Sequence, residues 1–234
     1  MQIQTVGIIG AGTMGNGIAQ ACATSGINVV MVDISEAAVQ KGLATVAGSL
    51  DRLIKKEKIT AADKEAALAK IKVSTDYSAL KAAQLVIEAA TENEALKIKI
   101  LQEVDALVGP EVLIASNTSS ISITKLAAVT GRADKFIGMH FFNPVPMMAL
   151  VEVIRGLQTS DATHAAVQAL AQQLGKTPIT VKNGPGFVVN RVLIPMINEA
   201  FFVLAEGLAT AEDIDAGMKL GCNHPIGPLA LADM

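Results

Sequence analysis

The sequence predicts an α/β protein in which a doubly wound sheet is followed by an all-helical region. Short aliphatic runs alternate with helix-compatible stretches up to about residue 182, a pattern typical of a parallel sheet with helices on both faces. Hydrophobic residues make up 51% of the chain and aromatic residues only 3%, as expected for strands that are buried on both faces. Beyond that point, residues 187–204 form one long apolar helical pattern, and a second helix is predicted to begin after Thr210.

Length and composition narrow the classes of function. A chain of 234 residues is long enough for one large α/β domain and a smaller one. The net charge of −3, with mixed signs along the chain, gives no reason to expect nucleic acid or a membrane surface as a partner. Cys22 and Cys222 match no metal or redox spacing. We therefore expect reduced thiols, no metal site and a cytoplasmic location.

Residues 1–32 carry no charged side chain, a length that can span a bilayer. Glycines and polar residues interrupt the stretch, and no basic residue precedes it as a signal peptide requires. We therefore interpret it as a buried strand, helix and strand.

A glycine-rich motif joins these elements. The strand-like run 3–9 leads into Gly10-Ala11-Gly12-Thr13-Met14-Gly15, a helix follows, and the next aliphatic run ends at Asp33. This is G-x-G-x-x-G in the setting of a Rossmann dinucleotide site, whose glycines allow a tight turn, close approach of a pyrophosphate and close helix–strand packing. The helix N-terminus would offer its free N–H groups to the phosphates. The alternative is a plain glycine turn between two core elements. The predicted cofactor-binding residues of the motif are Gly10, Gly12, Thr13, Met14, Gly15 and Asp33.

Asp33 also indicates which dinucleotide binds. A carboxylate accepts hydrogen bonds from the ribose hydroxyls and repels a 2′-phosphate. The following residues, 34–36, include no arginine that could bind such a phosphate. NAD is therefore the expected cofactor.

A second group of polar residues lies between Ser116 and Glu152. The strand-like run 136–139 ends at His140, and a reversal near Pro146 would set Glu152 opposite this histidine on an antiparallel strand. An imidazole with an orienting carboxylate forms a general-base pair. The alternative that these residues leave open is a core histidine beside a half-buried glutamate.

Further polar side chains follow the neighbouring strands. Runs 85–89 and 112–115 are predicted strands, and Glu92 and Ser119 come shortly after their ends. Loops that follow successive parallel strands meet at one edge of the sheet. We therefore expect Asp33, Glu92, Ser119 and His140 to share one crevice.

The sequence also predicts a helical arm and a boundary between two domains. Residues 35–71 form a helical arm whose charge cluster at 51–58 is either a solvated helix face or a cationic strip for the phosphates of a large substrate. Residues 182–186, Lys-Asn-Gly-Pro-Gly, are the strongest cluster of helix and strand breakers. They predict a dinucleotide-binding domain at 1–183 and a helical domain from 187 to 234.

Six segments of the chain resemble the NAD-dependent L-3-hydroxyacyl-CoA dehydrogenases, and most closely the bacterial 3-hydroxybutyryl-CoA dehydrogenases. HFFNPVP and PGFVVNR are far more specific than the glycine motif, which many dinucleotide enzymes share. The segments are VGIIGAGTMGNGIAQ, VIEAATEN, ASNTSSISIT, GMHFFNPVPMMALVEVI, NGPGFVVNR and MKLGCNHPIGPLALAD.

The resemblance implies roles for individual residues. His140 would be the catalytic base, Glu152 its carboxylate, Ser119 a hydrogen-bond donor to the substrate oxygen, and Asn190 the residue from the helical domain that completes the site. Other residues match ligand-contacting positions of the family. For the cofactor these are Glu92, Lys97, Ser119 and Asn143. For the substrate they are Ser49, Lys56, Ser119 and Asn190, of which Ser49 and Lys56 fall where the family's arm meets coenzyme A, and this favours the cationic strip.

The implied reaction is reversible oxidation of a short-chain (S)-3-hydroxyacyl-CoA to the 3-oxoacyl-CoA, as in fatty acid metabolism. The resemblance also implies a homodimer in the full-length protein, with further helices beyond residue 234. Gly184 stands where relatives often carry Ser or Thr. Two other functions stay open: a non-catalytic NAD-binding protein, and a Rossmann dehydrogenase that acts on a small free hydroxy acid.

Overall fold

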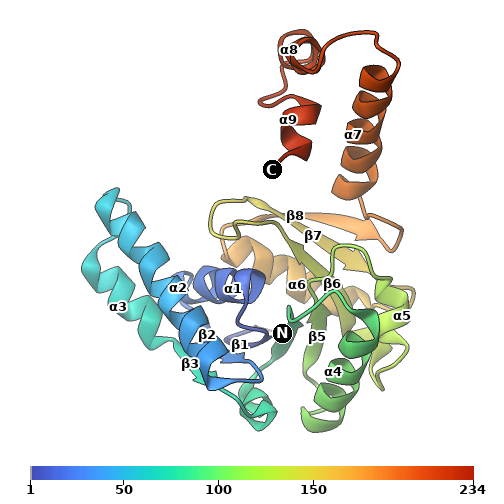
Figure 1. The fold of residues 1–234 in the computed structure, drawn as a ribbon. Helices are drawn as coiled ribbons and strands as arrows, with labels where there is room; N and C mark the ends of the chain where they lie inside the picture. The colour runs from blue at the N-terminus through green and yellow to red at the C-terminus, as the bar shows by residue number, and fades with distance from the viewer. Residues whose placement is uncertain (1) are drawn as a thin grey trace. The chain divides into compact units, whose positions relative to one another are not determined.

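The computed structural model describes residues 2–234, which divide into two compact units between Pro185 and Gly186 (Figure 1). The strands of unit 1 are β1 (Thr5–Ile9), β2 (Asn28–Val32), β3 (Ile71–Ser74), β4 (Leu85–Glu88), β5 (Leu113–Ser116), β6 (Phe136–Phe141), β7 (Leu150–Arg155) and β8 (Thr177–Lys182). Its helices are α1 (Thr13–Thr24), α2 (Glu36–Lys55), α3 (Ala61–Ala69), η1 (Tyr77–Ala82), α4 (Glu94–Leu107), α5 (Ile123–Ala127), η2 (Ala133–Lys135) and α6 (Asp161–Gln173).

The strands form one eight-stranded sheet in the order β3-β2-β1-β4-β5-β6-β7-β8. Neighbours from β3 to β6 are parallel, and β1 lies at the centre of the reversal in strand order that defines a doubly wound sheet. The predicted fold class is thus confirmed. β7 runs antiparallel to β6 because the short loop 142–149, rather than a crossover helix, joins them.

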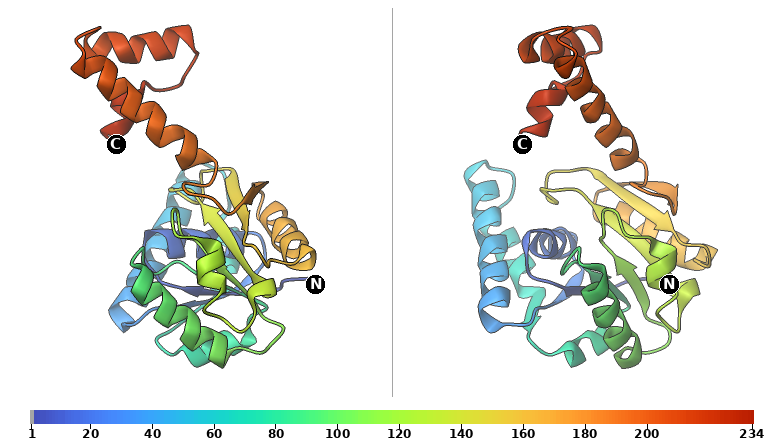
Figure 2. Two further views of the ribbon diagram at one scale, coloured as in Figure 1. Left: turned by 90° about the vertical axis from the view of Figure 1, so that its right-hand side faces the viewer. Right: turned by 45° about the vertical axis from the view of Figure 1, so that its right-hand side comes forward.

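The two faces of the sheet bury different sets of side chains, because successive residues of a strand point to opposite faces. One set, which includes Ile8 of β1, Ile87 of β4 and Met139 of β6, packs with residues of α1, α2, α3 and α6. On the opposite face, a side chain added at Gly7 would meet Leu80 of η1, and one added at Gly138 would meet Ile123 of α5. Figure 2 shows α4 and the α2–α3 pair on different sides of the sheet.

This alternation collects polar groups on one face. His140 lies two residues after Gly138 in β6, so its side chain points to the same face as that glycine. Glu152, Glu88 and Ser116 also point there, since Glu152 is paired with His140, and Lys97 of α4 binds Glu88. The sequence therefore places polar residues at or near the ends of β4, β5 and β6 on the face that α4 and α5 cover.

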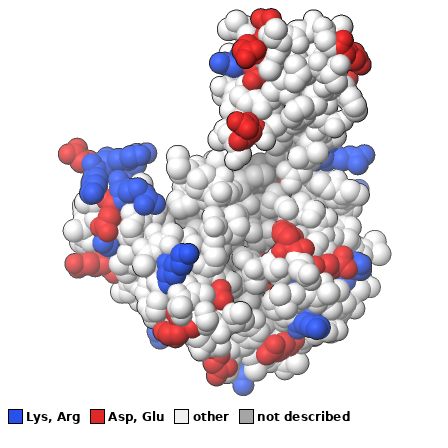
Figure 3. Space-filling view, viewed as in Figure 1, with Lys and Arg blue, Asp and Glu red and all other residues white. Residues whose placement is uncertain are grey.

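The helical arm consists of α2 and α3, which the sequence predicted as one helical region. Ser35 caps α2, and Thr60 and Asp63 form a capping box at the start of α3. Hydrogen bonds from Thr60 lower the pKa of Asp63. Figure 3 shows basic side chains gathered at the far end of this arm, where the exposed cations are Arg52, Lys55, Lys56 and Lys58.

Unit 2 contains α7 (Val189–Ala205), α8 (Ala211–Gly221) and α9 (Pro228–Ala232), which pack on one another. Thr210 accepts the predicted capping bond at the start of α8. Asp215 of α8 accepts hydrogen bonds from the backbone N–H groups of Leu229 and Ala230, at 2.8 and 2.9 Å, and so caps α9. Large apolar side chains of α7 remain exposed, among them Val192 and Phe202.

Some element boundaries differ from those predicted. β6 extends to Phe141, one residue beyond His140, where the sequence predicted it to end. The short helices α5 and α9 were not predicted, because five residues are too few to show a helical period. Within residues 2–234, no helix is long and apolar enough to cross a membrane, and no cluster of metal-ligating side chains is present.

Candidate active site

The glycine motif forms a tight loop between β1 and α1. Gly10 has a φ of +100°, which favours glycine, and its N–H donates to Val32 O at 2.8 Å. A Cβ on Gly15 would lie 1.8 Å from Gly10 O, whereas one on Gly12 would meet nothing within 4 Å. The loop is therefore tightly packed at Gly15, whereas space remains next to Gly12, the residue that precedes α1.

The start of α1 is suited to a phosphate. Among the described residues, no side chain caps this helix, and its first turn holds no acidic residue. Its first N–H groups and its dipole thus stay available to an anion. A cavity of about 330 Å³ opens here, lined by Ala11, Gly12, Thr13, Asn16, Asp33, Ala38, Lys41 and Thr45. Lys41 of α2 is a cation at this cavity that was not predicted, because nothing in the sequence shows that α2 faces the loop.

Asp33 lies where β2 ends and binds the glycine loop directly. Its Oδ2 accepts from Ala11 N and its Oδ1 from Ile34 N, each at 2.7 Å. A carboxylate has lone pairs beyond these two bonds, so it can still accept from ribose hydroxyls. The glycine cradle, the uncapped helix and Asp33 together fit NAD.

His140 and Glu152 form a buried pair at the end of β6. The register sets the two residues opposite each other, as the sequence predicted, and Nδ1 of His140 lies 2.7 Å from Glu152 Oε2. Glu152 is 0% exposed and His140 is 6% exposed. A carboxylate can only accept, so Nδ1 carries the hydrogen and Nε2 is the nitrogen that can take up a proton. The Phe142 ring lies 4.5 Å from the imidazole, centroid to centroid.

The turn after β5 connects this pair to the β4 loop. Glu92 accepts from Ser119 N at 2.8 Å, from Ser119 Oγ at 3.3 Å and from Thr118 Oγ1 at 2.7 Å. Asn117 accepts from Phe141 N at 2.9 Å, directly after His140. The structure thus joins Glu92, Ser119 and the end of β6, as expected for one sheet edge.

Lys97, which the resemblance places at the cofactor, has a buried partner. Its ammonium binds Glu88 Oε2, and both side chains are at most 1% exposed. Ser116 Oγ donates to the same carboxylate at 2.9 Å, and Ala90 N donates to Oε1 at 2.9 Å. Glu88 was missed in the sequence, where it is the last residue of an aliphatic run. A direct contact of Lys97 with the cofactor remains a prediction.

Asn143 lies in the loop between β6 and β7, which is held from two sides. The Asn143–Pro144 peptide bond is cis, and Asn143 itself is exposed. Lys176 donates to Val145 O at 2.6 Å and to Met148 O at 2.8 Å. On the other side the loop contacts α1, since a Cβ on Gly17 would lie 2.9 Å from Val145 Cβ.

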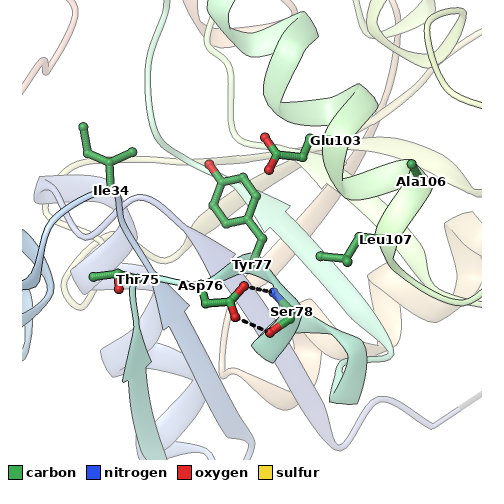
Figure 4. A pocket seen from close by; sticks show the side chains of 8 residues that line it. All are labelled: Ile34, Thr75, Asp76, Tyr77, Ser78, Glu103, Ala106 and Leu107. Carbon is green, nitrogen blue, oxygen red and sulfur yellow. Dashed lines mark hydrogen bonds between the residues drawn. The ribbon is translucent and has the colours of Figure 1, made fainter.

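A larger cavity, of about 600 Å³, lies beside Ile34 and between η1 and α4 (Figure 4). Burial and the nearby Glu103 raise the pKa of Tyr77, whose ring stands in this cavity. None of the residues predicted for catalysis or binding lines it. Size alone therefore does not locate the chemistry.

Comparison with known proteins identifies the family. Residues 5–184 match the 3-hydroxyacyl-CoA dehydrogenase NAD binding domain, and residues 186–234 match the C-terminal domain of the same family. The chain belongs to the 3-hydroxyacyl-CoA dehydrogenase family. It is an NAD-dependent oxidoreductase.

Individual members of this dehydrogenase family are similar over most of their length. The 3-hydroxybutyryl-CoA dehydrogenase of Bradyrhizobium diazoefficiens is 50% identical over 99% of this chain and 79% of its own. A probable 3-hydroxybutyryl-CoA dehydrogenase of Bacillus subtilis is 48% identical, over 100% of this chain and 81% of its own. The crystal structure of (S)-3-hydroxybutyryl-CoA dehydrogenase from Ralstonia eutropha is 78% identical, with a TM-score of 0.99 over 100% of this chain and 82% of its own.

Three residues that the resemblance to 3-hydroxyacyl-CoA dehydrogenases assigns lie on other elements than the His140 pair. Ser49 is half-buried on α2, and Lys56 is exposed at its C-terminal end, among the cations of the arm. Asn190 lies in the first turn of α7, within unit 2. The roles of all three stay predictions.

Proposed function

We propose that this dehydrogenase interconverts short-chain (S)-3-hydroxyacyl-CoA, 3-hydroxybutyryl-CoA above all, with the corresponding 3-oxoacyl-CoA. The observation that carries the proposal is the Nδ1 contact of His140 with Glu152, at the sheet edge that also holds the glycine loop. The names of the relatives from Bradyrhizobium and Ralstonia support the substrate.

The chemistry assigned to this chain is a proton transfer. In the oxidation, Nε2 of His140 removes the hydroxyl proton, and in the reduction the imidazolium returns it. Glu152 fixes the ring tautomer and stabilises the imidazolium. Bound NAD would supply the hydride acceptor for C3 in the oxidation, and NADH the hydride donor in the reduction. Ser119 and Asn190 donate hydrogen bonds at the reacting oxygen and the thioester side, and so orient the substrate.

The cofactor is held by residues of unit 1. The loop from Gly10 to Gly15 and the N-terminus of α1 bind its pyrophosphate, and Asp33 binds the adenosine ribose. Glu92, Lys97, Ser119 and Asn143 hold the nicotinamide half. Glu92 has the support that its carboxylate already fixes Ser119 N at 2.8 Å.

The coenzyme A end of the substrate is assigned to the arm. Lys56 lies beside Lys55 and Lys58 at the exposed end of α2, where a ligand that carries several phosphate groups finds cations. Ser49 lies about two turns earlier on the same helix. This favours the cationic strip over a merely solvated face.

Two other functions are less well supported. Burial of His140 and Glu152 would also suit a core histidine in a non-catalytic NAD-binding protein. Such a protein would not need Ser119, Glu92 and the His140–Glu152 pair together at one sheet edge. A dehydrogenase acting on a free hydroxy acid would leave the cations of the arm without a role.

The test follows NADH oxidation by acetoacetyl-CoA and, separately, by acetoacetate. We expect turnover of the thioester and little of the free acid. Lys56→Gln should raise KM for acetoacetyl-CoA by about 2- to 5-fold, the effect of one screened surface contact. The control is Lys99→Gln, an exposed lysine of α4. NADH binding without reduction of acetoacetyl-CoA would contradict the proposal, and equal rates on both substrates would indicate a free-acid dehydrogenase.

We also infer a homodimer that works in the cytoplasm. The exposed apolar side chains of α7 support a second copy as a partner, and the two free cysteines suit a reducing compartment. Light scattering after size exclusion tests the dimer, and a monomer at micromolar concentration would contradict it.

A further inference from the structure

We propose that Asn117 is a positioning residue for His140, and that its side-chain amide holds the end of β6 in place. The inference rests on the proposed function, because the effect it predicts is on proton transfer by His140. Asn117 touches the backbone next to the histidine, so it acts through His140 and is not itself a catalytic residue.

The backbone of β6 loses its β5 neighbour just before the histidine. The last register pair between these strands joins Ser116 to Gly138, two residues before His140. Beyond it the side chain of Asn117 takes over, since its Oδ1 accepts from Phe141 N at 2.9 Å. The main-chain N–H of Asn117 donates to Glu88 O at 2.8 Å. Asn117 therefore links β4 to β6 across the end of β5.

The neighbours of Asn117 show that the whole turn is a junction. Ser116 Oγ binds Glu88, and Thr118 Oγ1 binds Glu92. Three consecutive side chains thus bind three different segments, and only that of Asn117 reaches β6. Asn117 is 8% exposed, so the N–H of Phe141 cannot exchange this acceptor for bulk water without movement.

The expected size of the effect follows from geometry. On its other side His140 is fixed by the β6–β7 pairing and by Glu152. Loss of the amide leaves a buried N–H without an acceptor, which is unfavourable. The strand can avoid this cost by shifting toward water, and a misplacement of about 1 Å can lower a rate by about 100-fold.

The experiment compares three variants with the wild-type protein. Asn117→Ala removes the acceptor, and Asn117→Asp keeps an acceptor oxygen at the same distance from the backbone. The matched control is Thr159→Val at the other end of β6. Thr159 is buried, as Asn117 is. Its Oγ1 donates to Phe136 O at 2.7 Å and accepts from Gly156 N at 2.9 Å. Each variant is assayed for kcat with acetoacetyl-CoA, for KM of NADH and for hydrogen exchange at the Phe141 amide.

We expect Asn117→Ala to lower kcat by about 10- to 100-fold, to leave KM for NADH within about 2-fold, and to speed exchange at Phe141. Asn117→Asp should recover most of kcat, and Thr159→Val should keep it. A kcat for Asn117→Ala equal to that of Thr159→Val would overturn the inference, as would Asn117→Asp being as slow as Asn117→Ala. If the alanine variant does not bind NADH, Asn117→Ser replaces it in the same comparison.

Different results would refute the positioning role of Asn117 and the proposed function. An inactive wild-type protein, or a His140→Gln variant with normal turnover, would refute the function whatever Asn117 does. An active wild type with slow exchange at Phe141 in both Asn117 variants would refute the positioning role alone.

Discussion

At the scale of single residues, the buried ion pair of Glu88 and Lys97 ties the end of β4 to α4 beneath the site. Removal of two charges from water costs several kcal/mol per ion, so a buried pair is stable only when its remaining hydrogen-bonding groups are satisfied. Here Ser116 and Ala90 N supply further bonds to the carboxylate. The pair therefore fixes the strand ends from which the cofactor-side loops start.

Lys97→Met is predicted to lower the free energy of unfolding by about 3–5 kcal/mol, because it leaves the Glu88 carboxylate buried and unpaired. The double variant Glu88→Leu, Lys97→Met should recover most of that loss. Chemical denaturation measures the free energy of unfolding of the single and the double variant. Lys64→Met serves as the control, since Lys64 pairs with a half-exposed Asp51 at 2.6 Å and its loss should cost less than about 1 kcal/mol. A similar loss for Lys64 and Lys97 would refute the prediction.

Some residues of the site could be predicted from the sequence, and others could not. The opposition of His140 and Glu152 followed from one chain reversal and strand alternation, which are local properties. Glu88 and Asn117 could not be predicted, because their partners, Lys97 and Phe141, are reached only when neighbouring elements pack together.

At the scale of elements, the approach of α1 to the loop 142–149 depends on a glycine beyond the nucleotide motif. Gly17 is buried on α1, and Val145 of the loop contacts the space where a side chain would stand. Lys176 holds the same loop from the opposite side, and burial lowers the pKa of its ammonium. The loop that carries Asn143 is therefore clamped between two elements.

Gly17→Ala is predicted to destabilise the protein by about 1–3 kcal/mol, because the added Cβ overlaps Val145. It should also raise KM for NADH, since the displaced loop carries Asn143. Thermal unfolding and steady-state kinetics give both values. Gly48→Ala is the matched control on α2, where a Cβ comes no nearer than 4.0 Å to Arg52, and it should stabilise the helix by about 0.5–1 kcal/mol. Equal stability of Gly17→Ala and the wild type would count against the clamp.

Most elements of the sheet could be predicted, because buried parallel strands are continuous aliphatic runs separated by helical patterns. The antiparallel return of β7 was inferred from Pro146 and is confirmed by its register with β6. The predicted end of β6 was wrong by one residue, since hydrogen bonding to neighbouring strands, which the sequence does not show, decides where a strand stops.

At the scale of the whole molecule, the chain consists of two units, and the family's two domain models divide it at the same place. The Lys182–Gly186 breaker cluster contains this division. All of the predicted cofactor-binding residues lie in unit 1, so we expect binding of the dinucleotide to be a property of that unit. The role of Asn190 could not be derived from its own surroundings, since it lies in a different unit from His140.

NADH is predicted to raise the melting temperature of the protein, and NADPH to raise it much less. At 100 times its Kd, a ligand of the folded state adds about 2.7 kcal/mol of stability. The 2′-phosphate of NADPH would face the Asp33 carboxylate, which binds the glycine loop at Ala11 N. Differential scanning fluorimetry with both nucleotides at equal concentration checks this. Equal shifts would contradict the role of Asp33, and His140→Gln should keep the NADH shift.

We expect Glu152 to act on the reaction through His140, and a double-mutant cycle on kcat is the sharpest test of this coupling. His140→Gln should lower kcat for acetoacetyl-CoA reduction by about 10²- to 10⁴-fold, the usual contribution of a general acid–base group. Glu152→Gln alone should lower it less, and in the His140→Gln background it should have no further effect. If the two losses in kcat multiply in the double variant, Glu152 does not act through His140, and this would contradict the account. Near-normal turnover of His140→Gln would contradict it as well.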